Sequence, residues 1–275
     1  MLRGCVLAMA AFFLIAAQAG EARANDRFVV VQSTTSTENS GLFDHINPIF
    51  RQKTGIEVRV VAVGTGQAIR NAARGDGDVL LVHDRLAEEA FVANGDGVAR
   101  FDVMYNDFVI VGPASDPARA AESRDVAAAL SAIATTGSRF ASRGDDSGTH
   151  KAELRLWAQT GVDVNAASGT WYRETGAGMG ATLNTGIAMG AYIMTDRASW
   201  ISFGNKRGHR ILIEGDARLF NQYGIVLVNA DMHAGVKSDL GQQFVDWVLS
   251  GEGQTAINGY KVEGQQLFFT NASGS

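Results

Sequence analysis

Cysteine is almost absent from this 275-residue sequence. Cys5 is the single cysteine, and it lies near the N-terminus, ahead of an apolar run. If that N-terminal segment is removed, the chain has no disulfide, no thiolate nucleophile and no cysteine-based metal site. The Gly-x-Ser-x-Gly elbow, the His-Glu-x-x-His pair and the EF-hand loop are missing too. We therefore expect no catalytic residues, no protein-bound metal and no cofactor.

An excess of positive charge is also lacking. The chain has 24 basic and 29 acidic residues and a formal net charge of −5. Removal of residues 1–24 takes away Arg3, Arg23 and Glu21, which leaves 22 basic and 28 acidic residues. Because an acidic chain is a poor nucleic-acid binder, we expect no nucleic-acid partner. Any anion must then be bound by local donors and dipoles.

Proline is scarce and glycine is abundant. The sequence contains three prolines and 32 glycines. Glycine suits tight turns and close approach of the backbone to a ligand. A mature chain of about 250 residues is long for one domain and comfortable for two.

The N-terminus has the pattern of a secretory signal. Arg3 precedes an unbroken apolar run over residues 6–17, which is too short for a membrane span of about 20 residues. Residues 22–24 (Ala-Arg-Ala) then match a cleavage site before Asn25. We predict a signal peptide over residues 1–24 and a soluble, exported protein, most simply in a bacterial periplasm.

Four segments repeat one pattern, in which an expected strand ends in Gly, Ser or Thr residues and a helix begins. They cover residues 33–37, 64–67, 143–149 and 176–181. In parallel α/β domains, the carboxyl ends of the strands carry the ligand site. Two such domains, joined by two crossings of the chain, can close these turns on one small ligand.

The turn over residues 142–150 is the most informative of the four. Ser147 and Thr149 are N-cap residue types at the point where a helix should begin. A helix N-terminus has unpaired N–H groups and a partial positive charge. Together with the hydroxyls and Arg143, this indicates a site for a compact oxyanion.

Two long extended stretches flank the middle of the chain, at residues 99–112 and 221–229. Each is long enough to pass from one domain into another. We predict lobe I from residues 26–110 plus 220–275, and lobe II from residues 111–219.

Three motifs in the same order resemble the TupA-type tungstate-binding proteins of ABC importers. They are Gln-Ser-Thr-Thr-Ser-Thr at 32–37 with Ser-Gly-Leu at 40–42, Ser-Arg-Gly-Asp-Asp-Ser-Gly-Thr-His at 142–150 with Glu153, and Tyr-Ile-Met-Thr-Asp-Arg at 192–197. Ser33 stands where the family usually has threonine, which keeps a hydroxyl. The resemblance implies a two-lobed periplasmic solute-binding fold of the α/β class, type II-like. It also implies tungstate in the cleft between the lobes and delivery by a monomer to a membrane permease and its ATPase.

The expected ligand residues come from the four turns. Arg143 is predicted to be the one full positive charge that contacts the anion. Hydroxyl or backbone donors are expected from Thr35, Ser36, Thr65, Ser147, Gly148 and Thr149, and backbone donors from Gly178, Met179 and Gly180. We expect Asp145 and Asp146 to bond turn N–H groups or to pair with Arg143. His83, at a strand end, is interpreted as structural.

Several alternatives remain open from the residues alone. Molybdate has nearly the size and charge of tungstate. Sulfate is smaller, and phosphate would call for a carboxylate acceptor such as Asp145 or Asp146. A secreted enzyme could use His150 with Glu153, although we interpret these as a solvated pair. An adhesion protein using residues 143–145 (Arg-Gly-Asp) would need an exposed loop.

Overall fold

The computed structural model describes residues 27–272. The predicted signal peptide, residues 1–24, lies outside this range. Within the described residues, no helix combines the length and the apolar character needed to cross a membrane.

A long mixed sheet runs through the molecule, and eight of its strands follow the order β2-β1-β3-β9-β4-β7-β5-β6. The strands of its first part are β1 (Phe28–Thr34), β2 (Glu57–Val63), β3 (Val79–Val82) and β9 (Phe220–Val228). Those of its second part are β5 (Phe140–Ser142), β6 (Tyr172–Glu174), β7 (Tyr192–Asp196) and β8 (His209–Ile213). β1 is parallel to β2 and β3, and β5 is parallel to β6 and β7. The sheet therefore has a group of parallel strands at each end, and antiparallel strands lie between the two groups.

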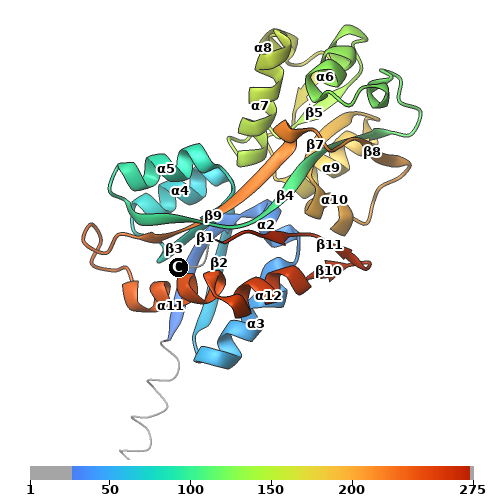
Figure 1. The fold of residues 1–275 in the computed structure, drawn as a ribbon. Coiled ribbons are helices and arrows are strands. Elements are labelled where there is room, and N and C mark those ends of the chain that lie inside the picture. The colour runs from blue at the N-terminus through green and yellow to red at the C-terminus, as the bar shows by residue number, and fades with distance from the viewer. Residues whose placement is uncertain (1–26, 273–275) are drawn as a thin grey trace, which may run out of the picture.

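Strand β4 (Gly97–Pro113) belongs to both parts of the sheet. It pairs with β9 as far as Asp107, and from Phe108 onward it pairs with β7. We call the β1–β3 part lobe I and the β5–β8 part lobe II (Figure 1). The change of partner at Asp107 supports the predicted boundaries near residues 110 and 220, which stay a proposal.

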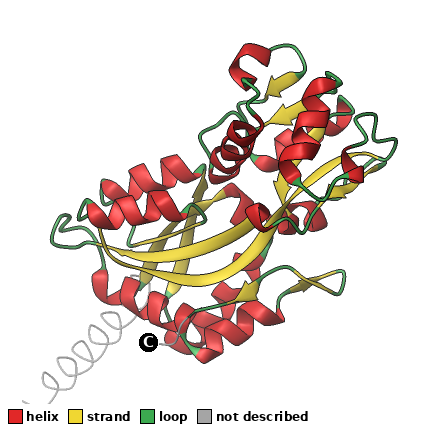
Figure 2. Ribbon diagram, turned by 45° about the horizontal axis from the view of Figure 1, so that its top comes forward, coloured by secondary structure: helices red, strands yellow, loops and turns green. Residues whose placement is uncertain are grey.

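Helices cover both faces of the sheet in each lobe, as Figures 1 and 2 show. Lobe I has α2 (Thr35–Asn39), α3 (Leu42–Thr54), α4 (Thr65–Ala73), α5 (Arg85–Ala93), α11 (Ser238–Leu249) and α12 (Gly251–Gly259). Lobe II has α6 (Val126–Thr135), α7 (Gly148–Thr160), α8 (Val164–Ala167), α9 (Met179–Ala188) and α10 (Arg197–Ser202). The short elements are the 3-10 turns η1 (Ala120–Glu122) and η2 (Ala217–Leu219), and strands β10 (Lys261–Val262), β11 (Gln265–Gln266) and β12 (Phe269–Thr270).

The alternation of side chains along the strands explains this layering. In β3, Val79 and Leu81 join the core beneath α3 and α11, whereas Leu80 and Val82 join the core beneath α4 and α5. Successive side chains of a strand point to opposite faces, so a strand that is apolar throughout needs helices on both sides. Burial of β3 on both faces fixes its central position in lobe I.

All four predicted turns join a strand to a helix. They connect β1 to α2, β2 to α4, β5 to α7 and β6 to α9. Ser147 caps α7, since its hydroxyl accepts the His150 N–H. Gly64 and Gly178 stand at the N-caps of α4 and α9 and have no side chain to cap them. The first N–H groups of these two helices are therefore available to a ligand.

Candidate oxyanion-binding site

The predicted turns meet between the lobes. The Gly148 N–H donates to the Thr65 hydroxyl at 2.8 Å, which joins the starts of α7 and α4. The α9 turn reaches the β1 turn, because a Cβ built on Gly178 would lie 3.6 Å from the Thr35 Oγ1. Residues expected at the site from both lobes thus lie in contact.

Arg143, at the end of β5, is the charged centre of this cluster. Its side chain is 2% exposed. Nη1 donates to the Ser36 Oγ at 3.2 Å and Nη2 to the Thr35 Oγ1 at 3.3 Å, so the guanidinium of lobe II bonds hydroxyls of lobe I. Burying a guanidinium is costly unless its N–H groups are hydrogen-bonded. The Ser36 and Thr35 hydroxyls therefore help to hold Arg143 at this position.

Asp145 holds Arg143 in place and shapes the turn. Its Oδ2 accepts from Nε and Nη2 of Arg143, at 3.2 and 2.6 Å, and its Oδ1 accepts the Ser147 N–H at 3.2 Å. Asp145 thus takes both of the roles expected for it. Gly144 has φ +60°, and a Cβ there would lie 2.8 Å from the Glu174 Cβ, so glycine is required.

The burial of Arg143 excludes the adhesion interpretation. An Arg-Gly-Asp sequence that binds a receptor must present its arginine to solvent, whereas here the arginine is enclosed by both lobes. Asp146 is the exposed member of the turn, and it pairs with Arg70 and Lys151.

The remaining predicted donors lie at helix starts. Thr149 is 1% exposed, and its hydroxyl has no hydrogen-bond partner among the described residues. A buried hydroxyl without a partner is costly, which makes it a candidate to bond a ligand. The Met179 side chain is in the core of lobe II, so this residue can offer only its backbone N–H, as expected.

His83 was not assigned to the site from the sequence, and the structure places it there. A Cβ on Gly148 would lie 3.3 Å from its ring. Its Nδ1 lies 3.1 Å from the Asn221 Oδ1, and the Asn221 Nδ2 donates to the Asn106 Oδ1 at 2.7 Å. Because the Asn221 oxygen must be an acceptor, Nδ1 donates and Nε2 carries the lone pair. Burial and the nearby Arg143 lower the pKa of His83 to about 4, so the ring is neutral.

The interpretation of His150 and Glu153 as a solvated pair is wrong. Glu153 is 2% exposed and accepts hydrogen bonds from Trp157 at 3.1 Å and from the Tyr172 hydroxyl at 2.7 Å. Burial raises the pKa of this carboxyl to about 7. The His150 Nδ1 instead accepts the Asp146 N–H at 3.2 Å. His150 therefore bonds the turn before α7, whereas Glu153 bonds aromatic side chains in the core of lobe II.

A metal centre is not indicated either. Among residues 27–272, no group of three or more His, Cys, Asp or Glu side chains is placed to hold a metal ion. The donors that converge are hydroxyls, N–H groups and one guanidinium, a set that suits an anion.

Known proteins share this sequence and fold. Residues 17–252 match the PBP superfamily domain. The tungstate-binding protein TupA of Peptoclostridium acidaminophilum is 45% identical over 249 residues, which cover 89% of this chain and 86% of that protein. The solved tungstate-binding protein TupA of Desulfovibrio alaskensis G20 is 45% identical with a TM-score of 0.75, covering 90% of this chain and 99% of that one. The solved tungstate ABC transporter protein of Geobacter sulfurreducens is 45% identical with a TM-score of 0.78. The match covers 86% of this chain and 99% of that one.

These similarities confirm the resemblance and the two-lobed α/β fold. They also support the expectation of a binding protein instead of an enzyme, since the TupA relatives are named for binding. The chain belongs to the PBP superfamily and, within it, to the family of TupA binding proteins.

Proposed function

We propose that this protein is the periplasmic substrate-binding component of an ABC importer and that it captures tungstate between its lobes. One observation carries the proposal most directly. The buried Arg143 guanidinium of lobe II bonds the Ser36 and Thr35 hydroxyls of lobe I, so a cation of one lobe and hydroxyls of the other meet at a single point. The names of the TupA relatives supply the choice of tungstate.

A tetrahedral oxyanion would be bound mainly by neutral donors. Its oxygens would accept from Arg143, from hydroxyls, and from the first N–H groups of α4, α7 and α9. The proposed ligand residues are Thr35, Ser36, Thr65, Arg143, Ser147, Gly148, Thr149, Gly178, Met179 and Gly180. Some of these donors now bond one another, as Gly148 does with Thr65, and would exchange that partner for the anion. Burial of these donors away from water strengthens each of these bonds.

Asp145 bears on which oxyanion fits. Phosphate carries a proton near neutral pH, and its O–H needs an acceptor. The Asp145 carboxylate is already engaged, Oδ2 by Arg143 and Oδ1 by the Ser147 N–H, so a phosphate O–H would have to share an oxygen that accepts another hydrogen bond. This favours fully deprotonated oxyanions, and a cage sized for tungstate would bind molybdate as well and the smaller sulfate less.

The decisive experiment is calorimetric titration with tungstate, molybdate, sulfate and phosphate. Wild type should bind tungstate, and Arg143→Ala should bind it roughly tenfold to a hundredfold more weakly, since charge-assisted hydrogen bonds contribute about 1.5–3 kcal/mol each. If the wild type binds no oxyanion, the transport proposal fails. Equal tungstate affinity in both proteins would remove Arg143 from the site.

Export and delivery are part of the same proposal. Cleavage before Asn25 would release a monomeric periplasmic protein that docks on a permease with its ATPase. Mass spectrometry of the exported protein tests the cleavage, and retention of residues 1–24 would contradict it. Tungstate uptake by cells that lack this protein or the permease tests the delivery.

A further inference from the structure

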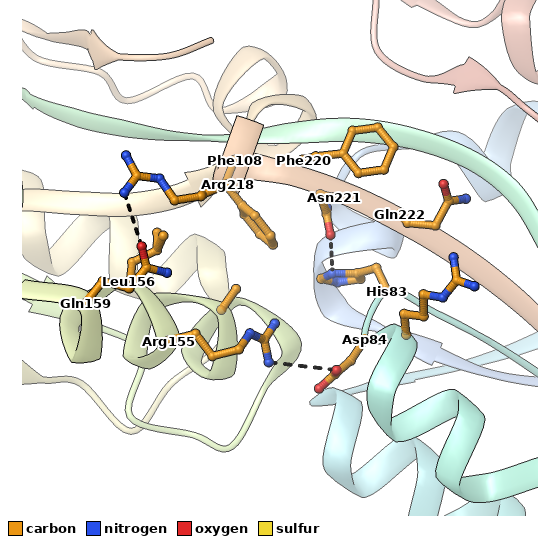
Figure 3. A pocket seen from close by; sticks show the side chains of 12 residues that line it. His83, Asp84, Phe108, Arg155, Leu156, Gln159, Arg218, Phe220, Asn221 and Gln222 are labelled. Atoms are coloured by element: carbon orange, nitrogen blue, oxygen red, sulfur yellow. Dashed lines mark hydrogen bonds and ion pairs between the residues drawn. The ribbon is translucent and has the colours of Figure 1, made fainter. Parts of the chain in front are cut away.

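Beside the oxyanion site, and sharing His83 with it, an ion pair joins the lobes. It lies in a cavity of about 420 Å³ that has His83 and Asp84 of lobe I on one side and Arg155 and Leu156 of α7 on the other (Figure 3). Across this cavity, the Arg155 Nη1 lies 3.9 Å from the Asp84 Oδ1. We infer that Asp84 and Arg155 set the affinity of the oxyanion site by holding the lobes together, although neither side chain contributes a donor to that site.

Asp84 is fixed on the side of lobe I. It stands two residues after the end of β3, its side chain is 4% exposed, and its backbone N–H donates to the Glu88 Oε1 at 2.8 Å. Glu88 is held in turn by Arg100 at 2.7 Å. The Asp84 backbone is therefore held in lobe I and its carboxylate is buried there, while the cation that pairs with it comes from the other lobe.

Arg155 is fixed to the oxyanion turn through α7. That helix begins with Gly148 and Thr149, so Arg155 lies seven residues along the same rigid element, or about 10 Å at 1.5 Å per residue. α7 is anchored in lobe II by Trp157 in the core. A movement of α7 that separates Arg155 from Asp84 therefore also withdraws the α7 turn from Thr65.

The energetic consequence follows from the difference between the two arrangements. With the lobes together, a nearly buried carboxylate has a cation beside it, and with the lobes apart it has only water. An interaction present in one state shifts the equilibrium toward that state. Apparent affinity scales with the fraction of protein in the binding-competent state, whichever ligand is bound. The pair should therefore change affinity for every oxyanion by the same factor.

The neighbouring charges do not replace this pair. Arg85, on the same rim of the cavity, is bonded to Glu89 at 2.7 Å, and Arg218 is bonded to Asp216. Another ion pair between the lobes joins Arg70 to Asp146. The Arg70 Nη1 lies 3.5 Å from the Asp146 Oδ2, and both side chains are 57% exposed. Because exposed pairs contribute little, this second pair should matter less.

The inference rests on the proposed function, and calorimetry on single variants tests it. Arg155 is 51% exposed, so its substitution should leave the fold intact. We expect Arg155→Gln to weaken tungstate and molybdate binding alike by about threefold to tenfold. Arg155→Glu, which faces Asp84 with a like charge, should weaken both by roughly tenfold or more. The ratio of the two dissociation constants should not change, and the loss should lie in the dissociation rate.

Two controls keep the result specific. Arg124→Glu makes the same charge change on the exposed surface of lobe II beside β8 and should leave affinity unchanged. Asp84→Asn combined with Arg155→Gln should cost no more than either change alone, because both remove one interaction. Small-angle scattering without ligand should show Arg155→Glu more extended than wild type.

The outcomes separate this inference from the proposed function. If wild type binds neither oxyanion, the proposed function fails and the inference falls with it. If wild type binds but Arg155→Glu binds equally well, the inference alone is wrong. A changed tungstate-to-molybdate ratio would also overturn it, since that would mean that Arg155 acts at the site itself.

Discussion

The backbone N–H of Gly148 donates to the hydroxyl of Thr65 across the cleft, with 2.8 Å between nitrogen and oxygen. One residue opens α7 in lobe II, and the other opens α4 in lobe I. Position 148 adds no side chain of its own between the two helix starts, because it is glycine. The distance between the lobes at the site is therefore set by the absence of a single Cβ.

We predict that Gly148→Ala weakens oxyanion binding. A Cβ at this position would lie 2.9 Å from the Thr65 Oγ1 and 3.3 Å from the His83 ring, so the lobes could not approach as closely. Overpacking costs about 1–3 kcal/mol, which corresponds to roughly tenfold or more in affinity. Calorimetric titration measures this.

Gly251→Ala is the matched control, because a Cβ there meets nothing within 4 Å. It should leave both affinity and thermal unfolding unchanged. Wild-type affinity in Gly148→Ala would show that the lobes do not close on this contact.

Arg143→Lys should also bind tungstate poorly, although it keeps the charge. The guanidinium donates to Asp145, Ser36 and Thr35 in three directions, and a lysine ammonium does not reproduce that planar fork. We expect a loss of roughly tenfold or more, since each tenfold change corresponds to about 1.4 kcal/mol. Titration of the lysine variant beside Arg143→Ala measures it, and wild-type affinity in the lysine variant would show that charge alone suffices.

Stability should fall as pH rises through neutrality because of Glu153. Burial raises its folded-state pKa from the usual 4.5 to about 7. Its contribution is then fully present below about pH 4.5 and is lost as pH rises through about 7. Glu153→Gln should flatten the decline in the free energy of unfolding, measured by urea denaturation at about pH 5 and 8.

Glu88 acts in the same direction, because burial raises its pKa to about 7 as well. The comparison of wild type with Glu153→Gln isolates one of the two residues. An unchanged pH dependence in that variant would mean that Glu153 is ionised in the fold at little cost.

His83 should remain neutral throughout the physiological range. Burial and Arg143 hold its pKa near 4, below the usual 6.5. Its contribution to stability is then fully present above about pH 6.5 and is lost as pH falls through about 4. NMR titration of its ring protons, assigned with His83→Gln, measures this pKa. A midpoint near 6.5 would contradict a buried ring that is hydrogen-bonded to Asn221.

The sequence was most informative where structure is local. Strand ends followed by Ser, Thr or Gly predicted four helix starts, and Ser147 caps α7 as its residue type suggested. These features depend on neighbours a few residues away, so a single sequence records them. The two long extended stretches predicted two lobes, the family motifs implied the same arrangement, and the structure then brought the turns of both lobes into contact.

What could not be predicted depends on partners far along the chain. His83 bonds Asn221, 138 residues away, and nothing near His83 marks that strand. The spacing of His150 and Glu153 on α7 predicted a solvated pair, but Tyr172 of β6 bonds the Glu153 carboxylate and helps to bury it. Side-chain burial of this kind is fixed by tertiary packing, which local patterns do not contain.

The continuity of β4 has a mechanical consequence. Because one strand belongs to both lobes and β9 runs beside it as far as Asp107 and Phe220, the lobes are joined without a flexible linker. Their relative motion must be taken up by a few backbone dihedrals where β4 changes partner. A motion of this kind would carry each lobe as a unit, so the donors of each lobe would keep their positions relative to one another and the cleft would need no refolding between anions.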